Sequence, residues 1–257
     1  MRKFTATVMV AAAAAIAVGG VLFGAGCAMG GSPGFYYDGD GIHVKERTAV
    51  PQREDHVQAY TKLSPVKNLD IRLENADLTI VQGEEWAVEY VLDGYRAEPE
   101  YRTENQTLTI REGEWRGEND WHIFSFGPSW WRDESAQSAS PYVKITIPKD
   151  GTLEQVMLEN EYGDIFVEKK LLAKEVSIYA ECGAVEMGDW EGDSLLVEEA
   201  YGCFTAGRLK GESLIISSES GEVKTGALFV KNADFQMEYG DLSATVEECA
   251  RVEVENE

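Results

Sequence analysis

The sequence predicts an all-β protein whose main part is a single-stranded β-solenoid, or β-helix, of about 19-residue coils, preceded by an N-terminal transmembrane helix. Three observations predict this class. A glycine returns at spacings of 20, 19, 19 and 19 residues, apolar residues alternate on both sides of it, and an uncharged apolar segment starts the chain. A fixed period of this length is typical of solenoids. The repeat glycines are Gly163, Gly183, Gly202, Gly221 and Gly240.

Each repeat contains two short strands. Apolar residues stand seven and five places before the glycine, as at Val156 and Leu158, and two and four places after it, as at Ile165 and Val167. A period of two is the pattern of a half-buried strand, and such coils must stack to bury their inner faces. We expect the glycine to serve a turn that needs positive φ or a close backbone approach. The alternative is an antiparallel meander with accidental spacing. The other corner of the coil is marked by Trp190, Leu209 and Leu228.

Residues 1–31 are predicted to be a membrane anchor or signal segment. Arg2 and Lys3 are followed by no charged residue before Asp38, and an apolar span of about 20 residues can cross a bilayer as a helix. Basic residues ahead of the span place the N-terminus in the cytoplasm and the C-terminal domain outside the cell membrane. Two alternatives stay open, a lipoprotein anchored at Cys27 and a cleaved secretory signal. All three export the rest of the chain.

The remaining chain divides into a tether at 32–65 and a β-solenoid domain at 66–257, in which the regular coils occupy 156–257. Residues 73–77 repeat the sequence pattern of the later coils without the glycine, so we expect a degenerate first coil there. Strands are also expected at 86–92 and 107–111, paired with each other.

Between the first coil and the regular coils lies an aromatic loop, residues 113–141. A loop of this length is usually functional or disordered. Exposed aromatic side chains would make it a binding tip for sugar, protein or lipid headgroups, whereas buried ones would cap the open end of the solenoid. Both interpretations stay open at this stage. The candidate contact residues are Trp115, Trp121, Phe124, Phe126, Trp130 and Trp131.

The charge of the chain excludes one class of partner. Asp and Glu number 46 against 23 Lys and Arg, for a net charge of −23. Phosphates of nucleic acid would be repelled, so no nucleic-acid partner is expected. The acidity suits a solvated ectodomain, cationic partners or loosely held metal ions, of which the first is the simplest interpretation.

No catalytic motif is found. The sequence has no nucleophile elbow, P-loop, dinucleotide fingerprint or paired-cysteine zinc motif, and its three histidines are scattered. We therefore predict a protein that is not an enzyme, with no cofactor and no metal site. A row of carboxylates at Asp164, Glu222 and Asp241 is interpreted as a solvated face. Cys182 and Cys203 flank successive repeat glycines and are a candidate disulfide in an exported protein, although both could stay free.

Several stretches resemble the putative-adhesin β-strand-repeat family of bacterial cell-envelope proteins, a domain of unknown function. They are 69–81, Leu108-Thr109-Ile110, the strand 143–148 and coils such as Tyr162-Gly163-Asp164-Ile165. The resemblance covers roughly residues 65–257. It implies an extracytoplasmic β-solenoid in a Gram-positive-like envelope, with some relatives associated with envelope-stress regulation, and it brings no catalytic residues.

These observations together predict a membrane-anchored, extracytoplasmic β-solenoid that acts as an adhesin or envelope scaffold without catalysis. Its partners would be the membrane, through the N-terminal helix, and an envelope protein or a cell-wall glycan. The first alternative is an accessory or sensor protein of an envelope-stress response. The second is a carbohydrate-active β-helix enzyme. The ligand and the oligomeric state are left open by the sequence.

Overall fold

The computed structural model describes residue 19 and residues 35–37, 42–44, 54–115, 124–126 and 140–256. It divides into two compact units, one of residues 1–52 and 117–137 and the other of residues 53–116 and 138–257. The predicted transmembrane helix at 1–31 lies outside the described residues except for Gly19. Among the residues that are described, no helix has the length and apolar character needed to cross a membrane.

The smaller unit contains a three-stranded antiparallel sheet in the order β2-β1-β9. Its strands are β1 (Phe35–Tyr37), β2 (Ile42–Val44) and β9 (Phe124–Phe126). Phe35 pairs with Phe126, so a segment of the predicted tether is hydrogen-bonded to a segment of the predicted aromatic loop. The positions of Phe124 and Phe126 are therefore strand positions rather than irregular loop.

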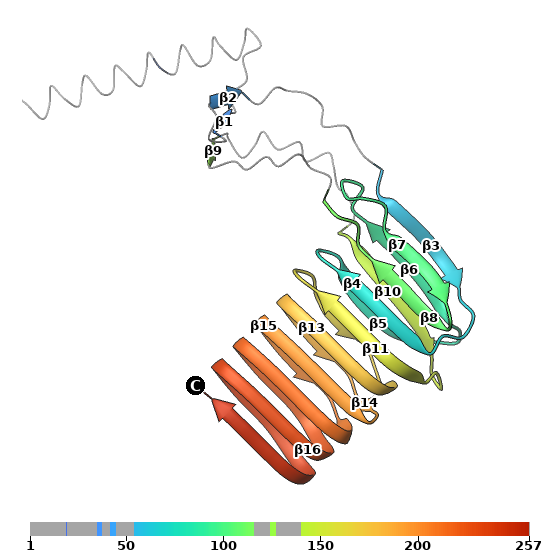
Figure 1. Ribbon diagram of the computed structural model, residues 1–257, viewed down its shortest axis with the longest axis vertical. Coiled ribbons are helices and arrows are strands. Elements are labelled where there is room, and N and C mark those ends of the chain that lie inside the picture. The colour runs from blue at the N-terminus through green and yellow to red at the C-terminus, as the bar shows by residue number, and fades with distance from the viewer. Residues whose placement is uncertain are drawn as a thin grey trace, which may run out of the picture. The chain divides into compact units, whose positions relative to one another are not determined.

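The larger unit is a solenoid whose strands form a single 13-stranded sheet wrapped around one core (Figure 1). The chain winds through parallel coils from β11 to the C-terminal end of β16, and these coils lie side by side in the figure. The strands are β3 (His56–Lys62), β4 (Asn68–Leu73), β5 (Asp77–Gly83), β6 (Ala87–Leu92), β7 (Glu100–Glu104), β8 (Thr107–Arg111), β10 (Tyr142–Pro148), β11 (Leu153–Asn160), β12 (Ile165–Val167), β13 (Leu171–Met187), β14 (Trp190–Glu191), β15 (Ser194–Ala206) and β16 (Leu209–Asn256).

The hydrogen-bonding register confirms the predicted repeat. Val185 of β13 pairs with Ile165 of the preceding coil and Phe204 of the next, and all three side chains are buried. The same holds for the strand before the glycine, where Ile178 pairs with Leu158 and Val197. Equivalent residues of successive coils thus form ladders whose neighbouring rungs lie about 4.8 Å apart, and these ladders make a continuous core.

Four of the five repeat glycines lie within the long strands β13, β15 and β16, whereas Gly163 lies between β11 and β12. Gly202 pairs in register with Gly183 and Gly221, so the ladder continues through the corner without a separate turn. A Cβ on Gly202 would overlap the carbonyl oxygen of Gly183. Gly183 also has a φ of 134°, a conformation that side chains disfavour. The close approach of neighbouring coils is therefore the main requirement for glycine here.

The degenerate first coil is confirmed, but one predicted strand pair is wrong. β4 and β5 pair in parallel with β11 and β12 of the next coil, as a first coil should. β8 pairs with β4 and β7 rather than with β6, whereas β6 pairs with β10 and β3. The alternation of apolar residues identified these strands correctly. It could not identify their partners, because β6 and β8 extend opposite faces of the solenoid.

The corner opposite the glycines is filled by the indole of Trp190, which is 1% exposed. Its Nε1 donates a hydrogen bond of 3.1 Å to the carbonyl oxygen of Ala173. Gly192 and Gly211 leave room for the ring, because a Cβ on either would lie within 3 Å of the indole. Leu209 and Leu228 continue this corner and are fully buried, as predicted.

The N-terminal end of the solenoid core is closed by antiparallel strands on both faces. Tyr90 of β6 and Tyr101 of β7 meet edge to face with ring centroids 5.9 Å apart. Burial raises the pKa of both phenols. Among the described residues, this tyrosine pair joins the two faces of the solenoid at its N-terminal end. The aromatic loop was one candidate to cap this end.

Candidate functional site

A row of exposed tyrosines follows the glycine corner of the solenoid. Tyr162, Tyr201 and Tyr239 each precede a repeat glycine and are 59%, 60% and 71% exposed. In the coils between them the same position holds Cys182 and Ser220, which pair in register with Tyr201. The tyrosines therefore occupy every second coil, and a rung spacing of about 4.8 Å places neighbouring rings about 10 Å apart along the solenoid.

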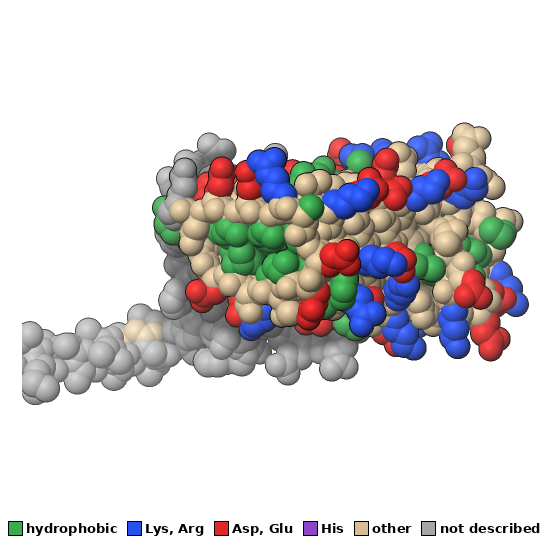
Figure 2. Space-filling model, turned by 90° about the horizontal axis from the view of Figure 1, so that it is seen from below, with side chains coloured by type: hydrophobic (Ala, Val, Ile, Leu, Met, Phe, Trp, Pro, Cys, Tyr) green, Lys and Arg blue, Asp and Glu red, His purple; other side chains and the backbone are tan. Residues whose placement is uncertain are grey.

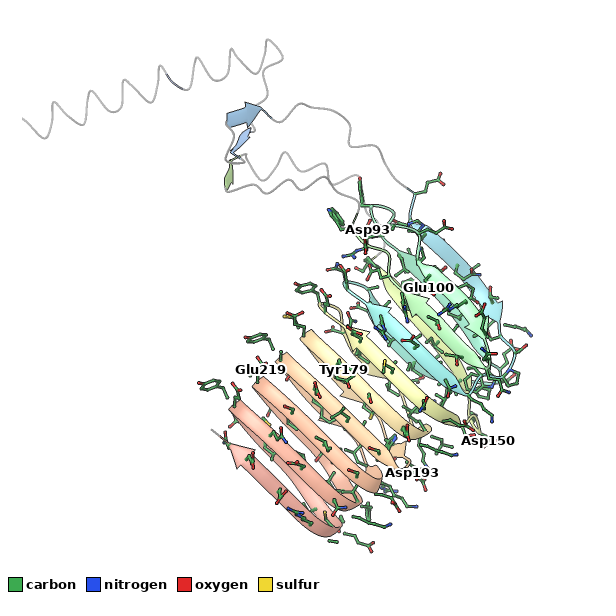
Figure 3. All side chains as sticks on the ribbon, in the orientation of Figure 1. Asp93, Glu100, Asp150, Tyr179, Asp193 and Glu219 are labelled. Carbon is green, nitrogen blue, oxygen red and sulfur yellow. The ribbon has the colours of Figure 1, made fainter. Side chains whose placement is uncertain are left out.

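A shallow groove of about 320 Å³ runs along the strand ends beside this row. It crosses several coils, since residues of β11, β13, β15 and β16 line it. Figure 3 labels Tyr179 of β13 and Glu219 of β16, two lining residues from different coils on the same side of the stack. We call the tyrosine row and this groove together the acidic tyrosine edge. The carboxylates of the groove are Glu159, Glu161, Glu181, Glu198, Glu199 and Glu219.

The groove is lined mainly by carboxylates, of which Glu159 pairs with Arg72 at 3.7 Å. No Lys or Arg is among its lining residues. Burial, and then repulsion by Glu74 and Glu181, raises the pKa of Glu161. Arg96 offsets part of this rise in pKa, and a net rise is expected where buried carboxylates face one another.

Glu199 lies beneath the corner and is 3% exposed. Its Oε2 accepts a hydrogen bond of 2.8 Å from the Ser218 hydroxyl, whereas its Oε1 has no hydrogen-bond partner among the described residues. Burial raises the pKa of this carboxyl. Glu199 continues a row of inward-facing residues that begins at Asn160. The Asn160 side chain donates a hydrogen bond to the carbonyl oxygen of Ala76 and accepts one from the N–H of Gly163.

The side chains of this edge are suited to binding a ligand. Tyrosine rings present flat apolar faces with a polar tip, and carboxylates accept hydrogen bonds from hydroxyl, amide or ammonium groups. Among the described residues, no three His, Cys, Asp or Glu side chains are placed to hold a metal ion. The predicted acidic row serves the backbone instead at Asp164, whose Oδ1 accepts the N–H of Ala184 in the next coil at 2.7 Å.

Trp115 is the one predicted contact tryptophan that the structure describes. It is 57% exposed, stacks on Tyr95 with centroids 6.3 Å apart, and lies 6.0 Å from the Arg96 guanidinium carbon. This ring is therefore not buried in the solenoid core, and its role as a contact residue stays a prediction. The side chains of Trp121, Phe124, Phe126, Trp130 and Trp131 lie outside the described residues, so their role stays a prediction.

The base under Trp115 is rigid. Arg96 is 5% exposed and pairs with Glu74 at 2.5 Å and with Glu112 at 3.2 Å. Glu112 Oε2 in turn accepts N–H groups from Glu74 and Asn75. This network fixes the turn of the first coil, where no repeat glycine is available.

Cys182 and Cys203 are free thiols that lie on opposite sides of the paired Gly183 and Gly202. Burial, followed by nearby carboxylates such as Glu199, raises the pKa of the Cys203 thiol. The thiol is thereby kept protonated, which slows its oxidation. The disulfide stays a prediction that thiol counting would test.

Sequence reasoning missed the acidic tyrosine edge, although its signal was visible. Tyrosine stands directly before the glycine in three of the five repeats, and Glu stands two places before the glycine in four. Only the stacking of coils shows that they form one continuous row.

Several solved structures are similar to this chain. A "putative adhesin" from Parabacteroides distasonis shares 14% identity, covers 77% of this chain and 77% of its own, and has a TM-score of 0.48. A "putative cell adhesion protein" from Clostridium sporogenes shares 10% identity over 76% of this chain and 100% of its own, with a TM-score of 0.42. A "putative adhesin" from Bacteroides fragilis shares 13% identity over 80% of this chain and 99% of its own, with a TM-score of 0.41.

No protein with a curated description matches the sequence. The family model of the Toastrack domain, DUF4097, matches residues 66–257, which is most of the chain. The chain therefore belongs to the Toastrack DUF4097 family.

Proposed function

We propose that this chain is a non-catalytic adhesin or scaffold of the cell envelope, and that its acidic tyrosine edge binds a cell-wall glycan. One observation carries the proposal: exposed tyrosines recur at one position of every second coil, beside a groove lined by carboxylates and by no basic side chain. Exposed apolar side chains that gather on one surface are typical of interaction sites, whereas single scattered ones need no explanation.

The chemistry of the edge fits an extended, hydroxyl-rich polymer. Sugar rings have apolar faces that can stack on tyrosine, and their hydroxyl and amide groups can donate to the carboxylates. A spacing of about 10 Å between tyrosines matches alternate units of a linear glycan that runs along the solenoid. Polyanionic polymers are disfavoured, because the groove would repel them.

An envelope protein with a basic surface is the competing partner, and it would suit the accessory or sensor role. The two partners differ in salt dependence. Attachment through ammonium and guanidinium groups weakens as salt screens the carboxylates, whereas stacking of neutral sugars does not. A carbohydrate-active enzyme would instead shorten the glycan, which the same assay detects.

Attachment to the cell membrane is also part of the proposal. The apolar segment 1–31 would hold the chain with its N-terminus in the cytoplasm and the solenoid outside, or Cys27 would carry a lipid. Protease added to intact cells should remove the solenoid and leave the membrane segment. Retention of the Cys27→Ser variant in the membrane would favour the helix over the lipid.

The glycan proposal is tested by sedimentation of the full chain with insoluble cell wall. Each tyrosine stack contributes about 0.5–1.5 kcal/mol, so replacing Tyr162, Tyr201 and Tyr239 together by alanine should weaken binding at least 10-fold. The control is Tyr60→Ala, because Tyr60 is 50% exposed but lies on β3, away from the edge. Equal binding by the triple variant and the wild type would refute the proposal.

A further inference from the structure

Trp115 lies two rungs before Tyr162 along the same corner of the solenoid. β8, β4 and β11 pair in parallel in that order, so Arg72 is in register with Arg111 on one side and with Glu159 on the other. Trp115 stands four places after Arg111. Tyr162 stands three places after Glu159, so the two aromatic residues fall within one position of each other around the coil.

The row of exposed aromatic side chains therefore begins at Trp115. Counted along the stack, Trp115 stands on the first rung, and the tyrosines of the acidic tyrosine edge stand on the third, fifth and seventh. A rung spacing of about 4.8 Å places neighbouring rings about 10 Å apart and gives the row a length of about 30 Å. The exposed aromatic side chains among the described residues are these four, together with Tyr60 and Phe166 elsewhere on the solenoid.

Charged side chains of both signs cover the corner opposite the row. Glu191 pairs there with Lys170 at 2.5 Å and with Lys210 at 2.8 Å. Figure 2 shows Lys and Arg side chains interspersed with Asp and Glu over much of the face in view. The exposed aromatic surface is thus gathered on one edge, which gives a bound polymer a path along the stack.

Arg96 connects Trp115 to the groove. Its guanidinium carbon lies 6.0 Å from the centroid of the Trp115 ring, and its Nη1 pairs with Glu74 at 2.5 Å. The carbonyl oxygen of Glu74 accepts the N–H of Tyr162 at 2.7 Å. Burial raises the pKa of Glu161, a carboxylate of the groove, and Arg96 partly opposes this rise. A continuous series of contacts therefore runs from the indole to the groove.

The indole of Trp115 is braced rather than covered. Its ring centroid lies 6.3 Å from that of Tyr95, and the Asp93 carboxylate accepts the N–H of Tyr95 at 2.9 Å. Figure 3 labels Asp93 at the N-terminal end of the stack. Trp115 also forms a β-bridge with Arg96, and 57% of its surface stays exposed. A ring held in this way loses little conformational entropy when a ligand stacks on it.

We propose that Trp115 is the terminal subsite of the acidic tyrosine edge, and that this edge selects glycan chains by their length. The inference rests on the proposed function, since the same cell-wall glycan is the ligand. Three tyrosines that contact alternate sugar units span about five units, and the addition of Trp115 extends the contact to about seven. Chains of that length gain a fourth stacking contact, which a shorter chain cannot reach together with the other three.

The test measures the affinity of the full chain in mild detergent for glycan strands released from cell wall and separated into fractions of about five and about seven units. Fluorescence anisotropy of labelled strands reports binding. One aromatic stack changes affinity by about 2- to 12-fold, so the wild type should bind the longer strands more tightly by that factor. Trp115→Ala should remove this preference. It should weaken binding of the shorter strands by no more than about 2-fold, because the three tyrosines still accommodate them.

Two control variants separate loss of the subsite from loss of the fold. Trp115→Phe keeps an aromatic face and should retain most of the preference for longer strands. Phe166→Ala is the matched control, because Phe166 is 39% exposed on β12, outside the row. It should leave the binding of both fractions unchanged. Thermal melts of each variant show whether the solenoid is intact.

The outcomes separate this inference from the proposed function. Failure of the wild type to bind strands of either length would overturn both. If replacement of the three tyrosines weakens binding but Trp115→Ala keeps the preference for longer strands, the glycan site stands and the terminal subsite is wrong. An equal loss for both lengths in the Trp115→Ala protein would also contradict a terminal position.

Discussion

Replacing Gly202 by alanine should loosen the solenoid at one corner. The new Cβ would overlap the carbonyl oxygen of Gly183 and lie 2.9 Å from Glu199 Oε1. The clash is with backbone of the neighbouring coil, so no side chain can rotate away to relieve it. Coil and neighbour must separate by about 1 Å, which stretches the adjacent ladder bonds beyond hydrogen-bonding distance.

The cost follows from those contacts. Two weakened ladder bonds at about 0.5–1.5 kcal/mol each and about 1–3 kcal/mol of packing strain give about 2–6 kcal/mol. Domains are stable by about 5–15 kcal/mol, so the variant should fold but melt about 10 °C lower.

Thermal unfolding of the full chain, followed by far-ultraviolet circular dichroism, measures this effect. The control is Gly83→Ala, whose new Cβ would meet only the methyl group of Thr146. We expect that variant to lose less than about 1 kcal/mol, since a side chain can adjust. A Gly202→Ala protein that melts within 2 °C of wild type, by the scale of about 2–4 °C per kcal/mol, would refute the close-approach explanation.

Three further predictions concern buried and paired side chains. Trp190→Ala should cost about 3–5 kcal/mol in chemical denaturation, because it empties a fully buried corner, whereas Trp190→Phe should cost less. Glu199→Gln should stabilise the protein by about 1–2 kcal/mol at pH 7. Because the pKa of Glu199 is raised, the folded state holds this proton more tightly than the unfolded state does. The residue therefore lowers the stability of the fold as pH rises from its unfolded pKa through its folded pKa. Melting temperatures measured over a pH series should show a smaller decline for the variant than for the wild type. Lys170 and Lys210 lower the pKa of Glu191 to about 2. The Glu191 carboxylate therefore stabilises the fold above its unfolded pKa, and this stabilisation is lost as pH falls towards 2. Lys170→Ala should raise the pKa of Glu191 measured by NMR titration.

The repeat was predictable because every coil repeats the same physical requirement. Each coil needs a glycine that admits the neighbouring backbone, with two inward apolar residues before it and two after it. Spacing alone is enough to find this pattern. The pairing of β8 was not predictable in this way. Alternation shows that a strand has a buried face, but it does not show which of two faces of a solenoid the strand extends.

The candidate site was predictable only in part. Trp115 was singled out because aromatic residues cluster in one stretch of the sequence, but whether it is buried or exposed was left open, and the structure shows it 57% exposed. Tyr162, Tyr201 and Tyr239 are far apart in the sequence and become a row only when coils stack.

The most direct test of the account is hydroxyl-radical footprinting of the full chain, read residue by residue by mass spectrometry, with and without cell wall. The account predicts that cell wall protects Tyr162, Tyr201 and Tyr239 and leaves Tyr60 unchanged. Protection confined to Trp115 and the aromatic loop, with the three tyrosines as reactive as before, would contradict it and move the binding surface to that loop.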